Sequence, residues 1–209
     1  MIATLNGFTC FFSLIVLVFF SIGTLGYSDG NDVLEKLYWF LVDTEDLIMY
    51  AGLQKMVFKK SGEYGAIYYG DTTACTEKFC DLCYFYGNLV FPLLVVSAIA
   101  TFIVLIMSFI GAHYPSIYLN SRSIVLSIIA TLSALVGWGS FMNNCYLSFT
   151  KSYTTGVGYG PGSSLPLIGF LLMFFASILQ IIATILGILA ERARVSKIVV
   201  YDENEHVGY

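Results

Sequence analysis

Four long stretches of this chain carry no charged side chain, and each is long enough to cross a lipid bilayer. They cover residues 8–26, 89–111, 123–142 and 165–190. A helix needs roughly 20 consecutive apolar residues to cross the hydrocarbon core of a bilayer. A charged side chain at the centre of that core costs at least a few kcal/mol. The pattern therefore predicts an all-α membrane protein, a bundle of four transmembrane helices, and excludes most soluble enzyme folds.

The composition leaves room for one membrane domain and no second soluble domain. Charged residues make up 11% of the 209 residues, whereas soluble domains carry about 25%. The net charge of −4 comes mostly from residues 27–86, and such an acidic segment does not indicate nucleic-acid binding. We expect a four-span membrane domain over residues 1–190, with a large first loop at 27–88, and a tail at 191–209.

Positive charges near the span ends indicate which side each loop faces. The second connection carries Arg122 and no acid, and the tail, which begins with Glu191, carries Arg192, Arg194 and Lys197. The positive-inside rule places these segments, and with them both termini, in the cytoplasm. The large first loop and the short third loop then face outward, and the plasma membrane is the expected location. A cleaved signal peptide is the alternative for the first span, although residues 1–7 lack the usual positive charge.

Four cysteines fall in the segments expected to face outward. Cys75, Cys80 and Cys83 lie in the first loop, and Cys145 follows the third span. Clustered cysteines in an oxidising compartment form disulfides, and four cysteines allow three pairings among which the sequence does not choose. A zinc site is the alternative, but no histidine lies in either outer loop. We therefore expect disulfides, and neither a metal nor a cofactor.

The first loop contains signals for a helix followed by a β-hairpin. Asp32 begins a capping-box pattern, and apolar residues recur at helical spacing after it, which predicts a helix over residues 32–53. Residues 55–58 and 64–69 are rich in β-branched and aromatic side chains. These two segments can pair across a turn at 60–63.

Small residues repeat along the third and fourth spans, and this spacing lets helix backbones approach closely in lipid. The same spacing would serve a lateral contact with a second copy of the chain. Gln180 is the strongly polar side chain well inside a span, so we expect it to form an interhelical hydrogen bond, with a transport site as the alternative. The residues expected at helix contacts are Gly137, Gly139, Gln180, Ala183 and Gly187.

The chain contains no recognisable catalytic constellation, and we expect no enzyme activity. His113 and His206 lie apart from any cysteine, serine or carboxylate pair of known spacing. Residues 154–164 are rich in glycine, but a nucleotide-binding loop would follow a strand and precede a helix with a Lys-Ser/Thr pair. A flexible outer turn is therefore expected there.

The tail supports two binding hypotheses. Arg192, Arg194 and Lys197 follow the fourth span closely enough to hold anionic lipid headgroups. Val207 and Tyr209 place a hydrophobic residue at the end of the chain and another two positions before it. This pattern suits strand addition to a cytoplasmic PDZ-type groove.

The layout resembles the claudin and peripheral-myelin-protein superfamily of four-span proteins. The resemblance rests on a very short N-terminus, a large cysteine-bearing first loop, two short connections and a short tail. The sequence Gly-Trp-Gly-Ser-Phe at 137–141, followed by Asn-Asn-Cys-Tyr at 143–146, is most similar to the protist and fungal claudin-like branch. The Gly-Leu-Trp motif of the claudin first loop is absent, so paracellular sealing is not implied. The resemblance implies a left-handed four-helix bundle, an outer loop domain and a role in adhesion or membrane organisation.

Two functions of different classes fit these observations. The first is a non-enzymatic structural or adhesion protein, whose outer loop contacts neighbours and whose helices pack laterally against another copy or another membrane protein. The second is a channel, or an auxiliary subunit that regulates a transporter. A pore requires polar groups that converge between the spans, and the sequence offers Gln180 with scattered serines and threonines.

Overall fold

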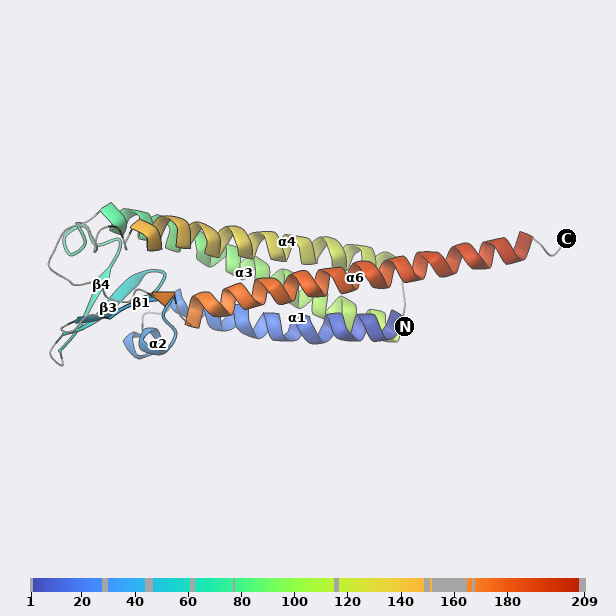
Figure 1. Ribbon diagram of the computed structural model, residues 1–209, viewed down its shortest axis with the longest axis horizontal. Coiled ribbons are helices and arrows are strands. Elements are labelled where there is room, and N and C mark those ends of the chain that lie inside the picture. The colour runs from blue at the N-terminus through green and yellow to red at the C-terminus, as the bar shows by residue number, and fades with distance from the viewer. Residues whose placement is uncertain are drawn as a thin grey trace. The chain divides into compact units, whose positions relative to one another are not determined.

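The computed structural model describes residues 2–27, 30–43, 47–60, 63–76, 78–114, 117–148, 151, 165–166 and 168–206. Four of its helices are long and apolar enough to cross a membrane, as the uncharged stretches predict (Figure 1). This architecture fits an integral, multi-pass membrane protein. The four helices are α1 (Ile2–Thr24), α3 (Lys78–His113), α4 (Ile117–Phe141) and α6 (Ile168–His206).

The side chains of these helices are distributed as a lipid environment requires. Large apolar residues such as Phe11, Ile99, Val125 and Ile185 are more than half exposed, whereas many hydroxyl side chains are buried. A helix of a soluble protein shows the reverse pattern, with its apolar stripe facing the core. Exposed apolar faces of this extent indicate contact with lipid rather than water.

The chain forms two compact units, and each is described by itself. The helical unit comprises Met1–Val18, Ser97–Leu132 and Ala176–Tyr209. The sheet-bearing unit comprises Phe19–Val96 and Ser133–Phe175. Each of the four long helices contributes residues to both units.

The sheet-bearing unit contains a five-stranded antiparallel sheet with the strand order β4-β3-β2-β1-β5. The register of β3 and β4 runs from Lys55 opposite Tyr68 to Lys60 opposite Glu63, which confirms the predicted hairpin. Strand β5 pairs Leu165 with Leu41 of β1. The strands are β1 (Phe40–Asp43), β2 (Leu47–Ala51), β3 (Lys55–Lys60), β4 (Glu63–Tyr68) and β5 (Leu165–Pro166).

The prediction of a helix over residues 32–53 is wrong beyond Lys36. The structure has a short helix, α2 (Asn31–Lys36), and then strands β1 and β2. Backbone pairing of β2 with β3, together with burial of Phe40 and Met49, outweighs the helical spacing of the apolar residues. Pairing between consecutive strands therefore outweighed the helical spacing of the residues within each strand.

The fourth span begins later than expected and its helix ends later. Leu165 and Pro166 form β5, and α6 begins at Ile168. The proline explains the difference, because the residue before a proline is biased toward extended backbone. At the other end, α6 continues to His206, through most of the segment expected to form the tail.

Two short helical segments adjoin the long helices. A 3₁₀ turn, η1 (Leu25–Tyr27), follows α1. A π-helix, η2 (Met142–Tyr146), extends α4. A π-helical turn holds an extra residue, so it changes the direction in which the following side chains point.

Candidate interaction site

Trp39 anchors the sheet to the helices of the sheet-bearing unit. Its side chain is fully buried, and its Nε1 donates a hydrogen bond to the Gly23 carbonyl at 3.4 Å. Its ring packs edge-on against Phe141, with 5.3 Å between the ring centroids. A Cβ at Gly169 would lie 2.9 Å from the Trp39 ring, so α6 approaches closely only because that residue is glycine. One residue next to β1 therefore contacts α1, α4 and α6.

The segment between β2 and β3 lies directly against α3. A Cβ at Gly87 would overlap the backbone carbonyl oxygen of Leu53, and Leu53 itself is fully buried. The Gly52 N–H donates to the Lys55 carbonyl at 2.9 Å, which closes the turn. Because the neighbour of Gly87 is backbone rather than a flexible side chain, this contact requires glycine.

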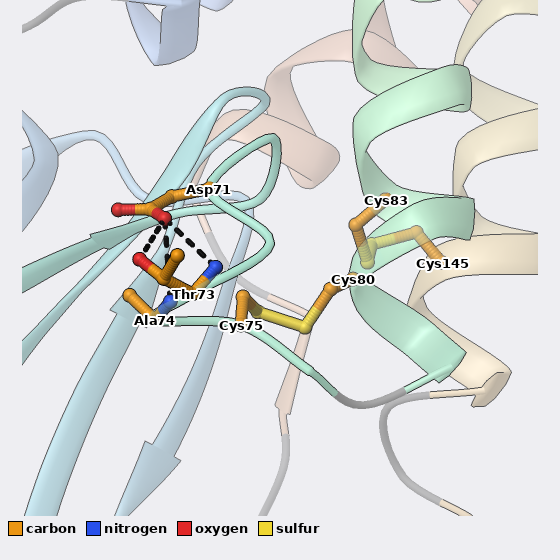
Figure 2. The surroundings of a disulfide bond; sticks show 7 residues. All are labelled: Asp71, Thr73, Ala74, Cys75, Cys80, Cys83 and Cys145. Carbon is orange, nitrogen blue, oxygen red and sulfur yellow. Dashed lines mark hydrogen bonds between the residues drawn. A yellow bond between two sulfur atoms is a disulfide. The ribbon is translucent and has the colours of Figure 1, made fainter.

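Two disulfides connect the segments around the sheet (Figure 2). Cys75 pairs with Cys80, and Cys83 pairs with Cys145. The predicted disulfide bonding is thus confirmed, and the structure selects one of the three possible pairings. The second bridge joins α3 to η2, where the π-helical turn positions Cys145 opposite Cys83. All four cysteines are buried.

The Asp71 carboxylate stabilises a turn of the chain just before Cys75. Asp71 Oδ1 accepts hydrogen bonds from the Thr73 hydroxyl at 2.6 Å, the Thr73 N–H at 3.0 Å and the Ala74 N–H at 3.3 Å (Figure 2). These bonds favour the charged form and lower the pKa of Asp71 below its ordinary value, the Thr73 hydroxyl contributing most. The Cys75 N–H donates to the Asp71 carbonyl at 2.8 Å, so the turn places Cys75 for its bridge.

The edge strand β4 presents exposed aromatic side chains. It ends the strand order, so one of its sides faces no other strand in the described part of the chain. Tyr64 and Tyr68 are 53% and 44% exposed. Lys59 Nζ lies 5.0 Å from the centroid of the Tyr64 ring, and Lys55 Nζ lies 5.2 Å from that of Tyr68. We call the exposed residues Tyr64, Ala66 and Tyr68, together with Lys59, the β4 surface.

The interior of the helical unit is lined by hydroxyl and amide side chains from all four helices. Asn6 Nδ2 donates to the Gly111 carbonyl at 3.0 Å and so links α1 to α3. Gln180 Nε2 donates to Ser127 Oγ at 2.8 Å, and Thr184 Oγ1 lies 2.6 Å from the same atom. Gln180 therefore has an interhelical partner. The buried polar residues of the four spans are Asn6, Thr9, Ser13, Ser97, Thr101, Ser108, Ser123, Ser127, Thr131, Ser177 and Gln180.

The small residues expected at helix contacts differ in their surroundings. A Cβ at Gly137 would lie 3.4 Å from Leu93 Cβ, and one at Gly187 would lie 3.5 Å from Ile124. Ala183 is fully buried. A Cβ at Gly139 would meet no atom within 4 Å, so this glycine lies beside open space.

The basic residues after the fourth span are also placed differently from one another. Arg192 is exposed, as a headgroup contact requires, whereas Arg194 is buried with its Nη2 3.8 Å from Glu191 Oε1. Lys197 lies further along α6. Val207 and Tyr209 lie outside the described residues, as does the glycine-rich stretch 154–164.

The described residues contain no group of His, Cys, Asp and Glu side chains that could hold a metal ion.

No known protein-family model matches the chain, and no curated protein sequence is significantly similar to it. The functional conclusion therefore rests on the β4 surface and on the polar interior of the helical unit. The sequence reasoning missed both features. The polar interior could have been predicted from the spacing of Ser123, Ser127 and Thr131, which recur about once per helical turn.

Proposed function

We propose that the chain is a non-enzymatic membrane protein that organises membrane or cell-surface contacts through its β4 surface. The observation that carries this proposal is the edge strand β4, which on one side pairs with no other strand among the described residues, held on a rigid base. Edge strands offer unpaired backbone groups to another chain, and strand addition is a common mode of recognition. Tyrosine is enriched at protein interfaces, and β4 exposes two of them.

The base of the β4 surface is rigid because of the contacts around it. Trp39 fixes the sheet to α1, α4 and α6, and the Gly87 contact fixes the β2–β3 segment to α3. The Cys75–Cys80 bridge follows β4 within the same loop. A surface that is already ordered loses less conformational entropy on binding, so these contacts favour association.

A second copy or another membrane protein is the proposed lateral partner. The lipid-exposed face of α4 includes open space beside Gly139, and small residues at such positions let a second helix approach closely. We place the β4 surface outside the plasma membrane and both termini in the cytoplasm. The disulfides, the positive charges after the fourth span and the resemblance to claudin-like proteins support this orientation.

Photo-crosslinking from β4 tests the proposal. A benzoylphenylalanine replaces Tyr64 or Tyr68 in separate variants of the full chain in its native membrane. Matched control variants carry the probe at Tyr84 or Phe85 of α3, which are 53% and 61% exposed in the same unit. We expect adducts with a second copy or another membrane protein from the β4 probes and few from the α3 probes. Adducts confined to α3, or none from β4, would contradict a binding role for this surface.

A channel or an auxiliary transport subunit is the second candidate, and the polar interior of the helical unit favours it. A pathway for ions needs polar groups that converge between spans, and all four helices supply them here. Reconstitution of the purified chain in planar bilayers tests this candidate. Currents that Gln180→Leu abolishes would support it, whereas a silent bilayer together with no co-purified transporter would eliminate it.

A further inference from the structure

Three side chains of the helical unit that have no exposed surface each carry a polar atom with no hydrogen-bond partner among the residues that the structure describes. These atoms are Ser13 Oγ on α1, Thr101 Oγ1 on α3 and Gln180 Oε1 on α6. Neither bulk water nor lipid can satisfy a group inside the bundle, and an unpaired buried polar group loses its full hydration energy. Three such atoms from three helices therefore require a common explanation.

The hydroxyl groups near Gln180 cannot supply the donor that its Oε1 lacks, because their protons are already used. Thr184 donates its hydroxyl proton to the Gln180 backbone carbonyl at 2.8 Å. Ser127 must then be the donor in its 2.6 Å contact with Thr184, while it accepts from Gln180 Nε2. Thr131 donates to the Ser127 backbone carbonyl at 2.8 Å. Gln180 Oε1 is thus left without a donor.

The unpaired atoms of α1 and α3 lie at similar depths in the helical unit. The Asn6–Gly111 hydrogen bond provides the reference level. Ser13 follows Asn6 by seven residues and Thr101 precedes Gly111 by ten. At about 1.5 Å per residue, their depths differ by about 4.5 Å, less than one helical turn.

The same counting relates Thr101 to the polar cluster on α4 and α6. The short connection between His113 and Ile117 provides the reference, since α3 ends and α4 begins there. Thr101 precedes His113 by twelve residues and Ser127 follows Ile117 by ten, so their depths differ by about 3 Å. Gln180 is hydrogen-bonded to Ser127, so Thr101, Gln180 and Ser13 occupy one layer of the interior.

We propose that ordered water occupies this layer and bridges Ser13, Thr101 and Gln180. One water molecule can accept protons from the two hydroxyls and donate one to Gln180 Oε1. Three hydrogen bonds are the usual number for a buried water molecule. The water supplies the missing hydrogen bonds of these three groups, independently of any contact made by β4.

The chemistry of the three groups selects water over a bound cation. Two of the groups are hydroxyls whose protons need an acceptor, and a cation accepts no hydrogen bond. Among the buried residues of this layer there is no carboxylate to neutralise a cation. An unpaired charge in such a place is strongly unfavourable. Water, which both donates and accepts, satisfies all three groups.

Water-edited solid-state NMR of the full chain in lipid bilayers tests this inference. The experiment measures how fast magnetisation from water reaches each side chain. We expect fast transfer to Ser13, Thr101 and Gln180, and slow transfer to the equally buried Val16 and Val104 of the same helices. Transfer to all five residues at the same slow rate would overturn the inference, because the layer would then be dry.

Three variants separate the bridging water from general hydration. Thr101→Val removes a hydroxyl at nearly constant shape and should abolish the fast transfer to Ser13 and Gln180, while Thr101→Ser should retain it. The matched control is Thr131→Val. The Thr131 hydroxyl is already bonded to a backbone carbonyl, so its removal should leave the transfer unchanged. Fast transfer that survives Thr101→Val contradicts the bridge. Chemical shifts of Gln180 that depend on the choice of sodium or potassium salt would instead assign the layer to a cation.

Discussion

The interior of the helical unit is built from hydroxyls and amides, whereas that of the sheet-bearing unit is built from aromatic rings and disulfides. In the first, hydrogen bonds such as Gln180 to Ser127 join neighbouring helices. In the second, Trp39 and Phe40 both pack against Phe141, and two bridges lie nearby. The same four helices contribute to both units, so the difference reflects what surrounds each part rather than which elements form it.

The solvent explains the difference. Helices surrounded by lipid gain nothing from burying apolar side chains against each other, because the lipid is equally apolar. Hydrogen bonds and close backbone approach therefore hold them together. A small sheet in contact with water can use the hydrophobic effect, but its core is small and covalent links compensate for this. The two units should therefore respond to different perturbations.

Removing the Cys83–Cys145 bridge should have the largest effect. The bridge closes a separation of 62 residues, and the loop-entropy relation gives a loss of about 4 kcal/mol in the free energy of unfolding for Cys83→Ser with Cys145→Ser. Removal of Cys75–Cys80, with a separation of 5, should cost about 2 kcal/mol. Both tryptophans, Trp39 and Trp138, belong to the sheet-bearing unit, so denaturant unfolding followed by tryptophan fluorescence reports on it. Equal losses from the two bridges would contradict this ranking.

Gly87→Ala should have the next largest effect. The added Cβ overlaps the Leu53 carbonyl oxygen, and relief of such overpacking typically costs about 1–3 kcal/mol. Gly7→Ala is the control, because Gly7 lies inside helix α1 and an added Cβ would meet nothing within 4 Å. The control should be neutral or stabilising by up to about 1 kcal/mol, since alanine is the better helix former. Fluorescence-detected unfolding of both variants measures the difference, and similar curves would show that the sheet does not depend on this contact.

Gln180→Leu should have a smaller effect, confined to the helical unit. The substitution removes the donor to Ser127, and interhelical hydrogen bonds in membranes contribute about 0.6–2 kcal/mol. Circular dichroism of thermal unfolding should shift, while tryptophan fluorescence of the native state stays unchanged. Ile182→Leu, at a lipid-exposed position of the same helix, is the control and should change neither signal. A fluorescence change as large as that of the disulfide variants would contradict the view that different interactions stabilise the interiors of the two units.

The sequence was sufficient to predict the features that depend on the local pattern of residues. The absence of charge predicts the four spans, because a charge in lipid is costly wherever it falls. The β-branched and aromatic residues at 55–58 and 64–69 predict the hairpin, because its two strands are adjacent in sequence. The interhelical bond of Gln180 follows from the same physical reasoning, since a lone amide in a span needs a partner.

Features that depend on distant segments were not predictable in the same way. The pairing of Cys83 with Cys145 needs the position of η2 relative to α3, which spacing does not supply. By contrast, residues 40–51 were predicted to be helical from the spacing of their apolar residues, and only the pairing of β1 with β2 and of β2 with β3 shows that they are strands. The polar interior of the helical unit was partly predictable from the sequence. Its hydroxyls recur at helical spacing in all four spans, but whether that face turns inward or toward a partner is settled only by packing.

The smallest expected effect concerns Asp71. This residue gives the sheet-bearing unit a titratable carboxylate, whereas the hydroxyl and amide side chains of the polar interior do not titrate. The pKa of Asp71 is lowered in the folded chain, so the turn contributes fully above the unfolded value of about 3.8 and is lost as the pH falls through the lower, folded value. The NMR shift of the Thr73 amide should follow this titration with a midpoint below that of an unfolded aspartate, and Asp71→Asn should abolish it. The hydroxyls of the helical unit do not titrate in this range, so the Thr131 signals should stay constant. A midpoint at or above the unfolded value would mean that the carboxylate does not hold the turn, since hydrogen bonds to the charged form must lower it.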